Sequence, residues 1–187
     1  VYLYMEEWDR AIEAANRAIK RAEGLTDYTT VEAGNQFYMT TYELSEVEWL
    51  FDMSITNFPF VPSGDLLSKY TNGDKRETLW FNANGSISKR AQKSGWGPNR
   101  TIRISEAYLN RAEALVLSQN ANIGEALADL NELRRHRIVG YQDISISDAT
   151  ILLGEIRVER RLELCFDGHR WFDLRRYGMP SISHDYK

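Results

Sequence analysis

Residues 159–176 have the sequence ERRLELCFDGHRWFDLRR, in which acidic and basic side chains alternate with apolar ones. Residues 155–163 carry two stripes of like charge at four-residue spacing. The acidic stripe is Glu155, Glu159 and Glu163, and the basic stripe is Arg157 and Arg161. Like charges four residues apart repel one another within an isolated helix, so each stripe is expected to face opposite charge from elsewhere in the chain. The candidate partners are Arg134, Arg135, Arg175 and Arg176.

This pattern predicts a structural ion network rather than a catalytic acid–base pair. A general acid needs a raised pKa, whereas arginines beside these glutamates would lower the pKa of a carboxyl group. The chain has 17 arginines against six lysines, and arginine is the residue preferred for bidentate or partly buried ion pairs. The predicted network comprises Glu159, Arg160, Arg161, Glu163, Arg170, Asp173 and Arg175.

Four amphipathic helices are predicted from apolar residues at helical spacing. They span residues 6–23, 104–117, 125–137 and 148–166. Gly24, Gly140 and Gly168 are expected to end three of them. Residues 11–16 (AIEAAN) and 126–131 (ALADLN) are similar to each other, and this weak repeat favours tetratricopeptide-like hairpins, in which small residues let helices approach closely. Ordinary antiparallel helices without a repeat are the alternative.

Residues 25–100 are predicted to form an irregular insertion between the helical parts. This segment holds 12 of the 22 aromatic residues, six of the 12 glycines and three of the four prolines. Short strands are predicted at residues 46–53 and 78–82, and at most a short helix at 65–70. Loops of this kind often carry binding sites.

Aromatic side chains in the insertion are candidates for stacking on sugar rings, whose C–H faces are flat and whose hydroxyls bond to nearby polar groups. Trp96 lies between two glycines and close to Asn99 and Arg100, which makes these three residues the first candidate site. Trp80 and Tyr70 are the second candidates. For each ring the alternative is packing against the helices, which is favoured more for Trp80 and Tyr70 than for Trp96.

Other classes of site are disfavoured by composition and spacing. The net charge of −4, from 23 basic and 27 acidic residues, disfavours nucleic-acid binding. No metal-binding histidine spacing or phosphate-binding loop is present, so no metal or cofactor is predicted. No apolar run approaches the roughly 20 residues of a membrane-spanning helix. Cys165, Trp8 and Trp171 are assigned to packing.

Five blocks of the chain resemble the SusD/RagB family. The first is residues 159–176, similar to the family's Glu-Arg-Arg-x-Glu-Leu…Gly-x-Arg-x-x-Asp-Leu-x-Arg signature, with Asp167 where the family usually has Glu. The second block, residues 103–114, is similar to the family's Arg-x-x-Glu…Ala-Glu-Ala helix. The third, residues 126–134, is similar to its Ala-x-x-Asp-Leu-Asn-x-x-Arg helix. The remaining two blocks are residues 62–76 and 1–19. Family members are usually more than twice as long, so the resemblance implies a fragment.

The resemblance implies a mainly α fold of tetratricopeptide-like helical hairpins with irregular insertions that carry the ligand site, and no catalytic residues. It implies a lipid-anchored glycan-binding protein on the outer face of the outer membrane, which delivers its ligand to a SusC-like TonB-dependent transporter. The expected organisation is one SusD-like domain over residues 1–187, incomplete at both ends: a hairpin remnant (1–24), the insertion (25–100) and a helical repeat region (101–187). The alternative is a helical-repeat module for protein–protein interaction, without a sugar site in this segment.

Overall fold

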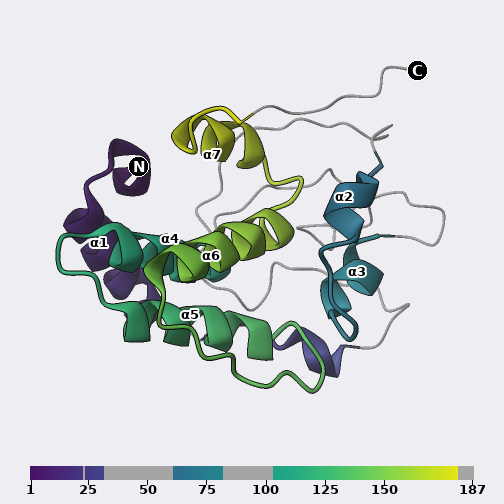
Figure 1. Cartoon of the computed structure of the whole chain (residues 1–187). Coiled ribbons are helices and arrows are strands. Elements are labelled where there is room, and N and C mark those ends of the chain that lie inside the picture. Colours follow the sequence, from purple (N-terminus) through teal and green to yellow (C-terminus); the bar gives the residue numbers. More distant parts are fainter. Residues whose placement is uncertain (23, 32–60, 82–102, 181–187) are drawn as a thin grey trace.

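The computed structural model of the 187-residue chain describes residues 1–22, 24–31, 61–81 and 103–180, and these form mainly helices (Figure 1). In chain order the elements are η1 (Tyr2–Met5), α1 (Trp8–Arg21), η2 (Tyr28–Thr30), α2 (Gly64–Leu67), α3 (Lys75–Trp80), α4 (Ile104–Leu117), α5 (Ile123–Arg135), α6 (Ala149–Glu163) and α7 (Arg170–Arg176). The described ranges contain no strand, and an isolated bridge pairs Asp74 with Ile138. The predicted mainly α class is confirmed.

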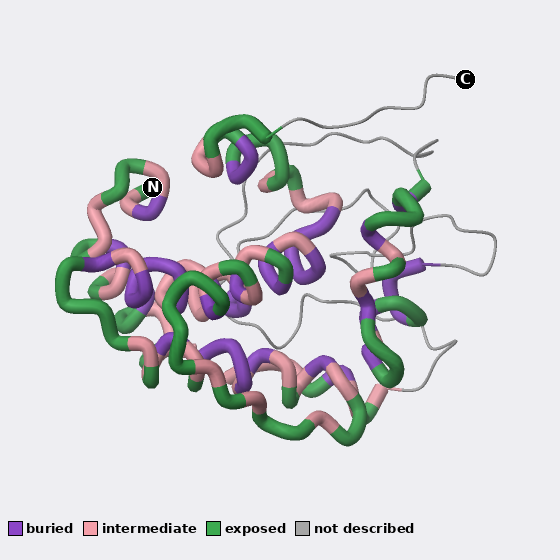
Figure 2. Tube along the Cα trace, in the orientation of Figure 1, coloured by how far each residue is buried: buried purple, intermediate pink, exposed green. Residues whose placement is uncertain are grey.

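Helix α4 is the centre of the helical part of the molecule, because it contacts α1, α5 and α6. Its sequence is apolar on more than one side, as a helix with several neighbours requires. The main core joins α4 to α5 and α6 through fully buried aliphatic side chains: Leu109, Leu130, Leu133, Leu152 and Ile156. Figure 2 shows buried residues along the sides of α5 and α6 that face the middle of the molecule. Each such side chain contributes about 1.5–3 kcal/mol on burial.

The two similar sequence segments lie in helices that both contact α4. Ala11 and Ala15 of α1 are buried, as are Ala126 and Leu130 of α5. Alanines at these positions let the helix backbones approach closely, which is the physical role that the sequence pattern predicts. The tetratricopeptide-like pairing and the division into three parts of one domain stay predictions.

Two of the predicted helices, α5 and α6, begin at capping side chains. Helix α5 begins two residues earlier than predicted because the Asn122 side chain accepts a hydrogen bond from the Glu125 backbone N–H at 3.1 Å. Asp148, expected as the first residue of α6, is instead its cap and accepts from the Ile151 N–H at 2.9 Å. The predicted bounds 104–117 of α4 are confirmed.

One predicted strand is wrong, and two short helices, α3 and α7, lie where no helix was predicted. Residues 78–80 belong to α3, because Asp74 caps this helix by accepting from the Arg76 N–H at 3.0 Å. Phe81, the next residue of that predicted strand, has an extended backbone and follows the helix. Residue 82 and the other predicted strand, at 46–53, lie outside the described residues. Helix α7 was not expected from apolar periodicity, since it has only seven residues.

A second core joins η2, α2 and α3 to the end of α6. Its buried members are Tyr28, Leu66, Tyr70, Leu79, Trp80, Phe81, Leu162 and Cys165, so the prediction that Cys165 packs in an apolar site is confirmed. Backbone hydrogen bonds hold this unit beside the end of α5: the Lys75 N–H donates to the Arg137 carbonyl at 2.9 Å, and the Val139 N–H to the Gly73 carbonyl at 3.0 Å. Among the helices described, none is long and apolar enough to cross a membrane.

The backbone pairing at Gly73 generates a prediction on stability. Gly73 has φ +87°, and a Cβ there would lie 3.1 Å from the Val139 carbonyl oxygen, so Gly73→Ala should lower the free energy of unfolding by about 1–2 kcal/mol. Gly154 is the matched control: it is exposed within α6 and has open space around it, so Gly154→Ala should raise that free energy by about 0.5–1 kcal/mol. Urea denaturation of both variants measures the change in the free energy of unfolding. A change of the same sign in the two variants would contradict the geometry at Gly73.

Candidate functional site

The most heavily charged part of the interior is centred on Glu163, near the end of α6. Its Oε1 accepts from Arg103 Nη1 at 2.6 Å and from Arg137 Nη2 at 2.9 Å, and its Oε2 accepts from Arg76 Nη1 at 3.0 Å. All four side chains are buried. Three arginines from distant parts of the chain therefore share one buried carboxylate.

Glu159, one turn earlier on the same face, extends this cluster. It accepts from Arg76 Nη1 at 2.6 Å and from Arg134 Nε at 2.7 Å. Arg134 also donates to Glu155 at 2.8 Å, so all three glutamates of the acidic stripe are paired with arginine. Arg134 was among the predicted partners.

The arginines decide the protonation state of the two buried glutamates. Burial alone would raise the pKa of Glu163, but Arg137, Arg103 and Arg76 hold that pKa well below its usual range. At Glu159, burial likewise raises the pKa of the carboxyl group, while Arg76 and Arg134 lower it, and the pKa is lowered overall. Both carboxylates stay ionised, which is the opposite of what a general acid requires.

A second ion cluster attaches α7 to the rest of the molecule. The buried Arg160 donates to Asp173 at 2.9 Å and to Asn110 at 2.7 Å. Arg176 makes a bidentate pair with Glu113, with both distances at 2.8 Å. These bonds join α7 to both α6 and α4, and the geometry is of the kind that makes arginine more specific than lysine.

The other predicted members of the network lie nearer the surface. Arg161 pairs with the exposed Asp65 at 2.6 Å. Arg170 and Arg175 lie on the exposed side of α7, and no ion pair joins either of them to the described residues. Arg135, predicted as a partner of the acidic stripe, pairs instead with Asp143 at 2.7 Å.

The second pair of predicted ligand-binding rings lies in the core. Trp80 is 0% exposed and packs edge-to-face on Tyr28, with 6.0 Å between ring centroids. Tyr70 is 8% exposed and donates from its hydroxyl to the Leu162 carbonyl at 3.1 Å. Neither ring has an open face for a sugar, so their position agrees with the packing alternative. The first candidates, Trp96, Asn99 and Arg100, lie outside the described residues.

Of the two tryptophans assigned to packing, Trp8 packs in part and Trp171 is exposed. Trp171 is 56% exposed on α7, which corrects its assignment. Trp8 is only partly buried: it packs against Leu3, Ala11 and Ala114, and it also borders a cavity of about 350 Å³. Helical spacing showed that Trp8 had a packing face, but it could not show that a cavity lies beside the same ring.

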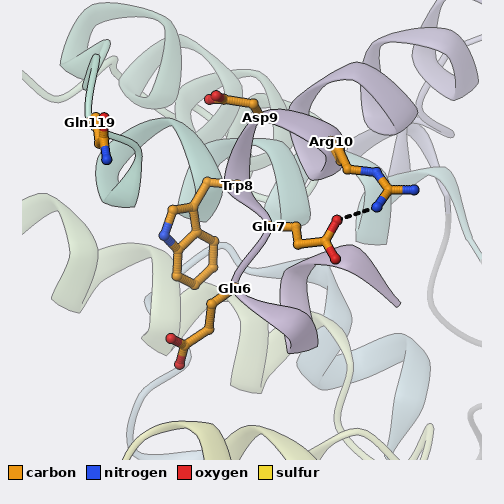
Figure 3. A pocket seen from close by; sticks show the side chains of 6 residues that line it. All are labelled: Glu6, Glu7, Trp8, Asp9, Arg10 and Gln119. Atoms are coloured by element: carbon orange, nitrogen blue, oxygen red, sulfur yellow. Dashed lines mark hydrogen bonds and ion pairs between the residues drawn. The ribbon is translucent and has the colours of Figure 1, made fainter.

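The cavity lies where η1 turns into α1. Its lining residues are Glu6, Glu7, Trp8, Asp9, Arg10 and Gln119. Figure 3 shows the indole of Trp8 between the side chains of Glu6 and Gln119, with Glu7 and Arg10 forming an ion pair to one side. An indole bordered by carboxylates and an amide can hold a small polar ligand that has an apolar face. Within the ranges described, no group of three or more His, Cys, Asp or Glu residues is placed to hold a metal ion.

Comparison with known proteins places the chain among relatives of known fold. A family model described as the SusD family matches residues 37–186. A SusD-like protein from Bacteroides fragilis NCTC 9343 is 18% identical, with a TM-score of 0.63 over 95% of this chain and 52% of that one. A SusD superfamily protein from Parabacteroides distasonis ATCC 8503 is 16% identical, with a TM-score of 0.57 over 90% of this chain and 47% of that one. The chain thus spans about half the length of these solved structures. No curated protein matches it significantly.

The Glu163 cluster predicts a large loss of stability on neutralisation. Glu163→Gln keeps the shape of the side chain but leaves three buried arginines short of one negative charge, so the free energy of unfolding should fall by about 3–5 kcal/mol. Urea denaturation measures this fall. Asp143→Asn, which breaks the exposed pair with Arg135, is the matched control and should change little. A loss at Glu163 no larger than the control would refute the role of the cluster.

The same carboxylates predict a dependence of stability on pH. Because the pKa values of Glu159 and Glu163 are lowered on folding, both stabilise the folded state at neutral pH, and that contribution is lost as the pH falls through the folded-state pKa values. The free energy of unfolding should decline as the pH drops below about 5, near the usual titration range of Glu. Urea midpoints at several pH values measure this decline, which should be shallower in Glu163→Gln; equal slopes would exclude Glu163 as its source.

Proposed function

The chain belongs to the SusD family, and from this membership we propose that it is part of a cell-surface protein that binds oligosaccharides or polysaccharides. The family match over residues 37–186 is the observation that carries the proposal, because it includes most of the aromatic segment as well as helices α2 to α7. In this proposal a lipid anchor holds the full-length protein at the outer membrane, and the bound glycan passes to a SusC-like TonB-dependent transporter. The protein binds and delivers its ligand without catalysis.

We place the ligand site of this proposal at Trp96, Asn99 and Arg100. An indole beside an amide and a guanidinium provides one stacking surface and several hydrogen-bond donors for a sugar. The scaffold next to this segment supports the proposal. Arg103, three residues further along the chain, is buried and bonded to Glu163 at 2.6 Å. A ligand loop that is anchored on a rigid scaffold loses less conformational entropy when it binds.

A second candidate function is favoured by the surface of α7. Trp171, Phe172 and the following Met179 are all more than half exposed, and exposed aromatic residues are enriched at protein interfaces. The burial of Tyr70 and Trp80 also leaves fewer rings for a sugar. Under this alternative the chain is a helical module that binds a protein, and Trp171 rather than Trp96 is the key aromatic residue.

Native affinity electrophoresis through a panel of plant, host and microbial polysaccharides tests the first function. We expect retardation by at least one polysaccharide, and we expect Trp96→Ala to lose it, with an affinity lower by about tenfold or more and a nearly unchanged melting temperature. Trp171→Ala removes an exposed tryptophan elsewhere and should leave the retardation intact. Absence of retardation by every polysaccharide would favour the protein-binding alternative, and unfolding of Trp96→Ala would place Trp96 in the core.

A further inference from the structure

We propose that the cavity beside Trp8 is a saccharide subsite that selects a sugar with a protonated amino group. This inference rests on the proposed glycan-binding function, but it concerns a different part of the chain from Trp96. Its basis is the combination of a fixed aromatic ring, an acidic rim and a cavity of about 350 Å³, a volume typical of small-molecule sites.

The aromatic ring of the cavity is held in place from one side and open on another. Trp8 begins α1 and packs against Leu3, Ala11 and Ala114, which fixes its orientation. The same ring borders the cavity between Glu6 and Gln119 (Figure 3). A preorganised indole offers a stacking surface to a sugar without losing side-chain entropy on binding.

The charges around the ring decide which sugar fits. The lining has three carboxylates and one guanidinium, and Arg10 is paired with Glu7. No ion pair joins Glu6 or Asp9 to any other described residue, and both are exposed. Figure 3 shows Glu6 below the indole and Asp9 above it. Exposed carboxylates on the rim attract a cation through Coulomb attraction, and the negative face of the indole adds to that attraction. The same rim repels acidic sugars such as uronic acids.

The amide of Gln119 completes the recognition of a sugar rather than of a bare cation. It comes from the turn after α4, and it can both donate and accept hydrogen bonds with hydroxyl groups. An amino sugar presents an apolar C–H face, hydroxyls and an ammonium group together. These three features match the indole, the amide and the two carboxylates.

Calorimetric titration with oligomers of glucosamine and of N-acetylglucosamine of equal length tests this inference. Acetylation removes the positive charge of the ligand, so the glucosamine oligomer should bind about tenfold more tightly. Trp8→Ala should weaken its binding by about tenfold, and Glu6→Gln and Asp9→Asn by about threefold each. The two charge variants keep the packed ring and therefore stay informative if Trp8→Ala is unstable.

Two variants provide matched controls. Trp171→Ala removes an exposed tryptophan that does not line the cavity, and Glu13→Gln neutralises an exposed carboxylate of α1 that does not line it either; neither should alter the affinity. Equal binding of the two oligomers, or unchanged affinity in all three cavity variants, would overturn this inference. If Trp96→Ala still abolished polysaccharide binding in that case, the proposed function would stand without this subsite. If no glycan bound at all, both would fail.

Discussion

The rest of the structure depends on one buried carboxylate, that of Glu163, and on the three arginines that surround it. Arg76 belongs to α3, Arg103 directly precedes α4, and Arg137 follows the end of α5. Arg137 also donates to the Thr26 carbonyl at 2.7 Å, which ties the segment before η2 to the same point. Each of these segments contributes an arginine to the cluster. Removing any one charge would leave a buried charge without its partner, which is strongly destabilising.

Two kinds of interaction therefore hold the chain together, apolar packing and buried ion pairs. Aliphatic side chains pack α4 against α5 and α6, and such packing tolerates exchanges of similar volume. The short α3 packs only Leu79 and Trp80 into the second core, and the buried ion pairs of its Arg76 add a second constraint on its position. Pairs of this kind add little net stability beyond apolar packing, because desolvation opposes attraction. Their contribution here is orientation, since the planar fork of arginine accepts only a few arrangements of carboxylates.

The sequence predicted the features that depend on local periodicity and missed those that depend on distant partners. The apolar spacing in residues 104–117 predicted α4 with its observed bounds. The glutamates at four-residue spacing predicted that opposite charge must face α6, and Arg134 was named as a partner. The spacing could not identify Arg76, Arg103 or Arg137, because nothing local relates them to Glu163. In the same way, Asp74 next to residues 75–80 could have indicated a capped helix, but the segment is too short for a periodic signal.

The aromatic residues show why the candidate sites were harder to predict than the fold. Spacing identifies the packing face of a ring on its own helix, whereas exposure depends on which other segment covers the ring. Trp80 is covered by η2 and the end of α6, and Trp171 is open on α7 although its neighbours Asp173 and Leu174 are buried. Aromatic content alone therefore does not locate a sugar site. The rings available to a ligand are those at the edge of the scaffold, such as Trp8 beside its cavity, where packing holds one part of the ring and leaves the rest open.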